Sequence, residues 1–318
     1  MKLRGAVIGV GYLGTFHGQK YRDLCQNRFQ NQIEFVGVCD VNAEQAKKVA
    51  SDLGVTAFFD PQELIGKVDL VSIATVTSSH FEMAKLFLEN GIHVNVEKPM
   101  TVTTVEAETL VAMAKAKKLT LCVGHSERFN PAFQAMKSEI KKISHMDLQR
   151  HAPYKSRGAE VSVVHDLMIH DIDLALSLDS SSCQVIRAEG GALLSKTLDW
   201  ANADLHFSSG ATAHISVSRM APQMTRVLKV IEASCCHEVN FQTGDWSLLS
   251  PTTPDLGLKI EVKNCGKGDN LKLETEAYFQ AVLNQAPSAI TGEDGRRALR
   301  IVEQVIAKVA TNKFGLNQ

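Results

Sequence analysis

The stretch Ala6-Val7-Ile8-Gly9-Val10-Gly11-Tyr12-Leu13-Gly14 decides the fold, because an apolar run passes directly into a GxGxxG motif that opens a helical pattern. Gly9 permits a tight turn, and Gly11 lets backbone N–H groups approach a pyrophosphate. Gly14 allows the helix to pack closely on the strand. The motif indicates a dinucleotide-binding turn, and the alternative is a glycine-rich turn that binds no nucleotide. The residues expected to contact a cofactor here are Gly9, Gly11, Tyr12, Leu13 and Gly14.

Further apolar runs repeat the pattern of a strand followed by a helix. They cover residues 35–39, 70–74, 93–96 and 119–123. Their apolar character is continuous rather than alternating, which is typical of parallel strands that helices cover on both faces. The sequence therefore predicts an α/β fold whose first domain, residues 1–125, is a doubly wound parallel sheet (Rossmann) domain.

Beyond this point the pattern changes to strict alternation of apolar and polar residues. Ala211, Ala213, Ile215 and Val217 alternate with polar residues, and a Ser-Ser-Gly turn separates them from another short strand at 203–207. Period-two alternation indicates a sheet with one solvated face, and the turn indicates an antiparallel hairpin. We predict a C-terminal α+β domain with a largely antiparallel open sheet, which serves substrate binding and oligomerisation, over 126–318. Its helices are expected near 131–142, 160–178, 272–284 and 295–311.

Composition excludes several classes of partner. A chain of 318 residues suits two domains of roughly 100 to 200 residues each. The 34 Lys plus Arg and 35 Asp plus Glu give a net charge of -1, so nothing favours nucleic acid or an anionic membrane as a partner. No apolar run in the chain approaches the length of about 18 residues that a membrane helix needs. We therefore expect a cytoplasmic protein that binds a small molecule.

The cysteines do not predict a metal site. There are seven, they are scattered, and no CxxC pair occurs among them. The spacings nearest to a ligand pattern are Cys122 with His125, and Cys236 beside His237, and neither has a second pair of ligands nearby in sequence. We expect reduced, mostly buried thiols and no metal.

Asp40 ends the second predicted strand, where a carboxylate can accept hydrogen bonds from an adenosine ribose. Its distance from the glycines exceeds the usual about 20 residues, and a longer first helix with a loop at 27–32 accounts for the excess. A carboxylate there repels a 2′-phosphate, and Val41-Asn42-Ala43 supplies no arginine, so NAD is favoured over NADP as the cofactor. The alternative for Asp40 is a turn or cap residue of the next helix.

The later strands bring polar residues to the same carboxyl edge of the sheet, where ligands bind in open α/β sheets. Lys98 is the residue of chemical interest, because a partly desolvated lysine beside a cationic nicotinamide gives up its proton more readily. The alternative is a solvated lysine in a polar turn. Further cofactor contacts are expected from Thr75, His80, Glu97 and Lys98.

The densest cluster of titratable residues is Val164-His165-Asp166-Leu167-Met168-Ile169-His170-Asp171-Ile172-Asp173. On a helix, Asp166 and His170 are four residues apart and share a face, so the carboxylate can orient the imidazole as a general base. From the residues alone, two alternatives remain open: a divalent metal site and ordinary helix polarity.

Together these motifs resemble the glucose–fructose oxidoreductase, inositol dehydrogenase and rhizopine-catabolism (Gfo/Idh/MocA) family of nucleotide-dependent sugar oxidoreductases. The resemblance covers essentially the whole chain, and it implies that Lys98, Asp166 and His170 form the catalytic group without a metal. One departure is Val76, since family members commonly have a proline after the threonine of that strand. The residues that carry the resemblance are Gly9 to Gly14, Asp40, Glu97-Lys98-Pro99, Asp166 with His170, and Ile290-Thr291-Gly292-Glu293-Asp294-Gly295.

Within the family, the segments 123–131 and 166–173 are most similar to the UDP-N-acetylglucosamine 3-dehydrogenase branch. That resemblance implies oxidation of a sugar 3-hydroxyl to a 3-keto sugar nucleotide, with NAD as cofactor. The alternatives are an inositol or free-sugar dehydrogenase and a non-catalytic NAD-binding regulator. Arg128 and Arg157 are candidate contacts of the diphosphate or sugar, beside Lys98 and His170 as substrate-binding residues. The exposed second sheet suggests a homodimer or homotetramer.

Overall fold

The chain forms two compact units in the computed structural model, which describes residues 2–156, 158–252 and 257–311. The first unit contains the residues up to Ser126 together with Asn270–Arg296. The second contains Glu127–Asp269 and the chain from Arg297 onward. These units differ from the expected domains, 1–125 and 126–318, at Ser126 and over Asn270–Arg296, which belong to the first unit.

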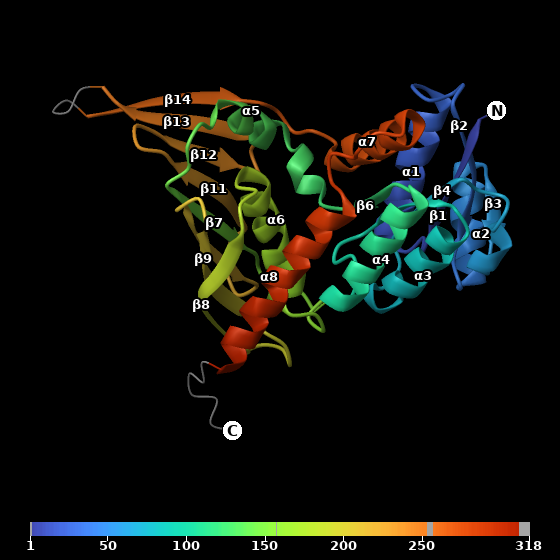
Figure 1. The fold of residues 1–318 in the computed structure, drawn as a ribbon, viewed down its shortest axis with the longest axis horizontal. Helices are drawn as coiled ribbons and strands as arrows, with labels where there is room; N and C mark the ends of the chain where they lie inside the picture. The colour runs from blue at the N-terminus through green and yellow to red at the C-terminus, as the bar shows by residue number, and fades with distance from the viewer. Residues whose placement is uncertain (1, 157, 253–256, 312–318) are drawn as a thin grey trace. The chain divides into compact units, whose positions relative to one another are not determined.

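The first unit is built on a six-stranded parallel sheet in the order β3-β2-β1-β4-β5-β6, which confirms the doubly wound prediction (Figure 1). The strand order reverses between β1 and β4, and a ligand crevice opens at such a point in this class of fold. The strands are β1 (Leu3–Ile8), β2 (Ile33–Cys39), β3 (Thr56–Phe58), β4 (Leu70–Ile73), β5 (His93–Val96) and β6 (Leu121–Val123).

Helices cover this sheet in two layers. Helix α1 packs with α2, and α3 packs with α4. Right-handed crossovers place these two pairs on opposite faces, because the chain moves outward from β1 in one direction and outward from β4 in the other. The elements are α1 (Tyr12–Gln26), α2 (Ala43–Leu53), the 3₁₀ turn η1 (Pro61–Leu64), α3 (Thr77–Glu89) and α4 (Thr104–Lys117).

Helix α7 (Asn270–Asn284) also belongs to the first unit, although it follows the whole second sheet in sequence. It lies beside α1 in Figure 1, and its Phe279 makes edge-on ring contacts with Tyr21 at 4.8 Å and with Phe29 at 5.4 Å between centroids. Helical periodicity predicted the helix correctly. It could not show which unit the apolar face of the helix covers, because that depends on complementary side chains about 250 residues away in the chain.

The second unit contains an eight-stranded sheet in the order β14-β13-β12-β11-β7-β10-β9-β8, antiparallel except for the pair β7 and β10. The predicted hairpin is confirmed as β9 and β10, and alternate residues of β7, β9, β10 and β12 are buried, so one face of the sheet carries the core. The strands are β7 (His145–His151), β8 (Cys183–Gly191), β9 (Trp200–Phe207), β10 (Thr212–Ser218), β11 (Thr225–Ile231), β12 (Cys236–Asn240), β13 (Asp245–Pro251) and β14 (Leu258–Asn264).

Helices of the second unit cover the buried face of this sheet, with α5 on β12 and β13 and α6 on β7 and β10. The turn before α6 is a π-helix, which the sequence did not predict. None of the helices in the described ranges combines the length and the apolar character that a membrane span requires. The elements are η2 (Ser126–Phe129), α5 (Pro131–Glu139), the π-helix η3 (Val164–Met168), α6 (Ile169–Leu178) and α8 (Gly292–Thr311), which begins in the first unit.

Candidate active site

The glycine turn has one glycine that the protein itself does not require. Gly9 has a φ of +79°, and a Cβ there would lie 2.7 Å from the Thr75 side chain. A Cβ on Gly14 would overlap the carbonyl oxygen of Gly9. A Cβ on Gly11 would meet no atom of the described residues within 4 Å. Gly11 therefore leaves open a space at the N-terminus of α1, as the approach of a pyrophosphate requires.

Asp40 holds the glycine turn in place. One carboxylate oxygen accepts the Val10 N–H at 2.8 Å, and the other accepts the Asn42 N–H at 2.9 Å. The Gln45 side chain donates to the Val10 carbonyl oxygen at 2.6 Å, so the main-chain N–H and the carbonyl oxygen of Val10 are both hydrogen-bonded. The cap of α2 is Asn42, whose side chain accepts two backbone N–H groups. Asp40 is thus a turn residue that still faces the pocket beside the glycines.

A pocket of about 560 Å³ lies between the glycine turn and the end of β2. Tyr12 and Phe16 are exposed here, at 65% and 37%, although aromatic side chains are usually covered. An adenosine fits such a site, because the rings offer an apolar surface and Asp40 offers an acceptor for ribose hydroxyls. The lining residues are Gly11, Tyr12, Thr15, Phe16, Gln19, Asp40, Asn42 and Gln45.

Thr75, His80, Glu97 and Lys98 follow β4 and β5 at the same carboxyl edge. His80 is buried, and its two ring nitrogens contact the carbonyl oxygens of Pro99 at 2.8 Å and Thr75 at 3.1 Å. Burial lowers the pKa of His80 against the opposing effect of these bonds. His80 therefore links the loop after β4 to the loop after β5. Its direct contact with a cofactor stays a prediction.

Glu97 is bound to a residue that the sequence analysis did not select. Its carboxylate contacts the imidazole of His17 on α1 at 2.8 Å, and both side chains are buried. His17 lies in the same buried row of the helix as Gly14, Tyr21 and Leu24. A histidine inside an apolar row at helical spacing was the available sequence signal, because a buried imidazole needs a partner.

In the second unit, Asp166 lies in the π-helix η3 and His170 in the first turn of α6, both half-buried. The expected spacing of four residues assumed an α-helix. The wider π turn rotates Asp166 relative to His170, and such turns occur frequently at functional sites. Their joint role stays a prediction.

Two buried ion pairs fix the helix that carries His170. Asp171 receives two-nitrogen contacts from Arg150 on β7 at 2.9 to 3.1 Å, and Asp173 receives them from Arg128 at 2.6 and 2.7 Å. Burial raises the pKa of Asp171, and Arg150 opposes this effect. These two-nitrogen contacts fix the rotation of α6 about its axis, because a planar guanidinium can donate two hydrogen bonds to a carboxylate only over a narrow range of carboxylate positions.

This finding bears on Arg128, one of the two arginines expected to contact substrate. Arg128 is 7% exposed and its guanidinium is directed at Asp173, so its position explains the anchoring of α6. A contact between Arg128 and a diphosphate is untested. Arg157 lies outside the described residues.

Glu232, Cys235 and His237 form a cluster with metal-ligating atoms within 4.8 Å of one another. Trp246 donates its ring N–H to Nδ1 of His237 at 3.3 Å, which leaves the imidazole proton on Nε2. A metal ligand needs that nitrogen without its proton. Cys235 donates to a Glu232 carboxylate oxygen at 3.4 Å, and Nε2 of His237 lies 3.5 Å from the same oxygen, so contacts within the protein account for the cluster. The expectation of no metal stays a prediction.

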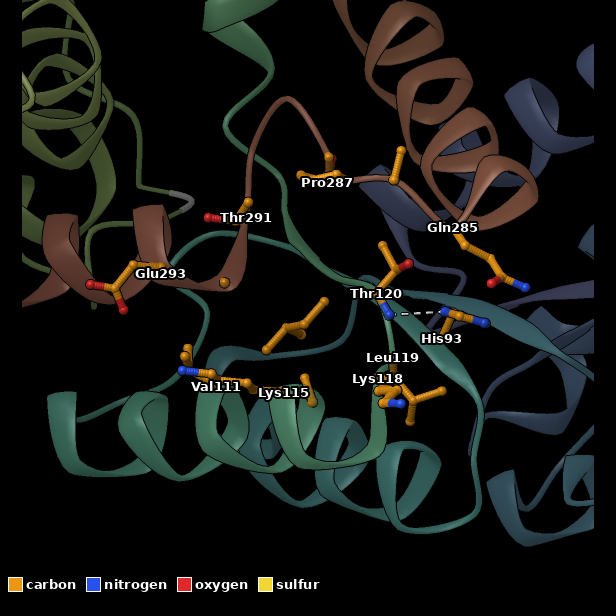
Figure 2. A pocket seen from close by; sticks show the side chains of 15 residues that line it. His93, Val111, Lys115, Lys118, Leu119, Thr120, Gln285, Pro287, Thr291 and Glu293 are labelled. Carbon is orange, nitrogen blue, oxygen red and sulfur yellow. Dashed lines mark hydrogen bonds between the residues drawn. The ribbon is translucent and has the colours of Figure 1, made fainter.

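A second pocket of about 500 Å³ lies at the opposite edge of the first sheet, where β5 and β6 begin (Figure 2). It is lined by α4, the loop before β6 and the segment between α7 and α8. His93 accepts the Thr120 N–H at 2.9 Å there. None of the predicted site residues within the described ranges lines this pocket, so we separate it from the candidate active site.

A doubly wound sheet with an open glycine turn and an acidic residue beside it is typical of dinucleotide-binding proteins, and a lysine at the same edge favours an oxidoreductase among them. Sequence models of protein families agree with this class. Residues 3–125 match the oxidoreductase family with an NAD-binding Rossmann fold, and residues 140–234 match the Gfo/Idh/MocA C-terminal domain. The chain belongs to the Gfo/Idh/MocA family of NAD-binding oxidoreductases, as the resemblance implied.

Full-length relatives extend this similarity. The UDP-N-acetylglucosamine 3-dehydrogenase of Acidithiobacillus ferrooxidans is 34% identical over 98% of both chains. A solved structure of that enzyme superposes with a TM-score of 0.90 at 33% identity, covering 98% of this chain and 99% of the other. The myo-inositol 2-dehydrogenase of Thermotoga maritima is 25% identical over 93% of both chains.

The glycine turn gives a test of the cofactor site. We expect Gly11→Ala to leave the melting temperature near native and to weaken NAD binding at least tenfold, because its methyl group enters only the space meant for the pyrophosphate. Gly14→Ala should instead destabilise the first unit by more than about 2 kcal/mol through overpacking. Calorimetric NAD titration and thermal unfolding measure both effects. Native NAD affinity in Gly11→Ala would contradict the placement of the cofactor.

Proposed function

We propose that this oxidoreductase converts the 3-hydroxyl of UDP-N-acetylglucosamine to the 3-keto sugar nucleotide with NAD. The observation that carries the proposal is the 34% identity over 98% of the chain with a relative of that activity. Lys98, Asp166 and His170 are all present, which supports an enzyme rather than a regulator that only binds NAD. Nothing in the chain's charge favours a nucleic acid or a membrane as its partner.

The oxidation removes a hydride from C3 of the sugar and a proton from the 3-hydroxyl. A C=O double bond then joins C3 to the former hydroxyl oxygen. When bound, NAD supplies the hydride acceptor, and the glycine turn with Asp40 would hold it. We assign the proton to His170 as general base. Lys98 donates a hydrogen bond to the reacting oxygen and stabilises its developing negative charge, while Asp166 orients the imidazole.

Replacement of the catalytic group tests these assignments. His170→Ala and Lys98→Ala should each lower kcat by roughly 10²- to 10⁴-fold, the usual range for one general acid or base. Asp166→Asn should lower kcat as well, and NAD binding should stay near native in all three variants. The residue whose loss removes a limb of the pH profile of kcat/KM is the proton acceptor, which separates Lys98 from His170. Retention of most activity by His170→Ala would contradict the assignment.

An inositol dehydrogenase is the second candidate, because an inositol dehydrogenase is also similar over most of the chain. An NAD-reduction screen with UDP-N-acetylglucosamine, UDP-glucose, free sugars and inositols separates the two activities. The proposal expects the highest kcat/KM for UDP-N-acetylglucosamine and weak activity with the free sugar. Activity that is restricted to inositols would replace the proposed substrate, and inactivity of the NAD-loaded protein with every substrate would favour a regulator.

The choice of NAD over NADP rests on Asp40, whose carboxylate lines the pocket and has no basic residue directly after it. Titration should show tighter binding of NAD than of NADP. Asp40→Ala should weaken NAD binding by about 1 to 3 kcal/mol, the contribution of a charge-assisted hydrogen bond. The preference for NAD over NADP should narrow as a result. The variant should also lose stability, because Val10 and Asn42 lose their acceptor. Equal affinity of the native protein for both cofactors would refute the assignment.

We also propose that the active form is a homodimer or homotetramer formed through the second sheet. Strand β14 ends that sheet, and its alternate residues Leu258, Ile260 and Val262 are 58%, 57% and 63% exposed. Such a row on an edge strand needs a cover, and an identical sheet supplies one. Sedimentation should give a mass above that of one chain, and Ile260→Glu should lower it. A native monomer would contradict this proposal.

The cytoplasmic location stays a prediction.

A further inference from the structure

Two buried histidines hold the residues on either side of Lys98. His17 reaches from α1 and contacts the Glu97 carboxylate with Nε2 at 2.8 Å. His80 reaches from α3 and contacts the Pro99 carbonyl oxygen with Nδ1 at 2.8 Å. Each histidine is 1% exposed, so neither is available for contact with a substrate in this structure. Their positions constrain the turn that carries Lys98.

The Glu97 carboxylate has little freedom in this arrangement. One oxygen contacts His17, and the other accepts the main-chain N–H of Lys98 at 3.1 Å. A Cβ on Gly124 would lie 2.9 Å from three atoms of the Glu97 carboxyl group, which shows how closely the backbone just after β6 is packed on this group. The Glu97 N–H donates to the Ile73 carbonyl oxygen at 2.9 Å. A chain of contacts therefore runs from α1 to the amide of Lys98.

Given the catalytic role proposed above for Lys98, we propose that His17 is a positioning residue that holds Lys98 through the Glu97 carboxylate. His17 lies on the helix that begins at the glycine turn. The same helix would thus place both the cofactor and the lysine that acts beside it. Positioning of this kind matters because a displacement of about 1 Å can cost about 10²-fold in rate.

Charge supports an ionised Glu97 in this network. Burial raises the pKa of the Glu97 carboxyl, but the His17 hydrogen bond and the charges of His17 and Lys98 outweigh burial, so the pKa lies below its usual value. Glu274 faces it from α7, and burial together with the charge of Glu97 raises the pKa of the Glu274 carboxyl well above its usual value. His80 also senses the charge of Glu97. Loss of His17 would remove the main support of the ionised form.

The test compares three variants. His17→Ala removes the contact, and His17→Gln keeps an N–H donor near the position of Nε2. His93→Ala is the control, because His93 is a half-buried histidine whose ring, like that of His17, is hydrogen-bonded, but it lies at the start of β5, the opposite end of the strand that leads to Glu97 (Figure 2). The readouts are kcat and KM with the best substrate, NAD affinity, unfolding temperature and the pH profile.

His17→Ala should lower kcat about 10- to 100-fold with NAD affinity within about threefold of native, and His17→Gln should recover most of the loss. The acid limb of kcat should move to higher pH in His17→Ala, because Glu97 then binds its proton more readily. His93→Ala should keep kcat near native, because its contact with Thr120 lies at the opposite edge of the sheet from Lys98. Equal kcat losses in His17→Ala and His93→Ala, with no shift of the pH profile, would overturn the proposal.

A second readout does not depend on the proposed substrate. The rate of Lys98 acetylation by acetic anhydride, followed by peptide mass spectrometry, reports the environment of its ammonium group. His17→Ala should change that rate severalfold relative to surface lysines, while His17→Gln and His93→Ala should not. An unchanged rate would overturn the positioning role. If the native protein oxidised no sugar but the rate changed, the proposed function would fail and the positioning of Lys98 would stand.

Discussion

The common direction of the six strands in the first sheet is the constraint on which the candidate active site depends. Because all pairs are parallel, every strand ends at one edge, and every loop that follows a strand starts there. Gly9, Asp40, Thr75 and Lys98 are far apart in sequence and belong to four different loops of this edge. Residues that begin strands, such as His93, lie at the other edge. The topology thus separates a cofactor edge from a structural edge within one sheet.

Buried charges then fix orientation within each unit. Removing one partner of a buried ion pair leaves the other charge uncompensated and lowers the free energy of unfolding by about 3 to 5 kcal/mol. The pair therefore permits few alternative arrangements of the elements that it joins. Arg150 with Asp171 and Arg128 with Asp173 hold α6 in the second unit. In the first unit, the buried contact between the His17 imidazole and the Glu97 carboxylate holds the turn that carries Lys98. In both cases the held element carries a residue to which we assign a catalytic role.

The glycines show how a structural and a ligand-binding demand can be separated within one motif. Gly9 and Gly14 are required by contacts of the protein with itself, whereas Gly11 faces open space. Asp40 combines both demands, since it binds two backbone N–H groups of the turn and also lines the pocket. Cofactor binding would therefore act on a turn that the protein has already ordered, which lowers the entropy lost on binding.

The sequence by itself determined the parallel sheet, the glycine turn, the hairpin of the second sheet and the identity of the family, because each is expressed in local periodicity or in a short motif with fixed spacing. Only the tertiary structure decided that α7 packs on α1, that the turn carrying Asp166 is a π-helix, and that Arg128 is directed at Asp173. It also brought His17 to Glu97 across 80 positions of the chain. These features depend on which distant side chains meet in a packed interior, and neither period nor spacing encodes that meeting in one sequence.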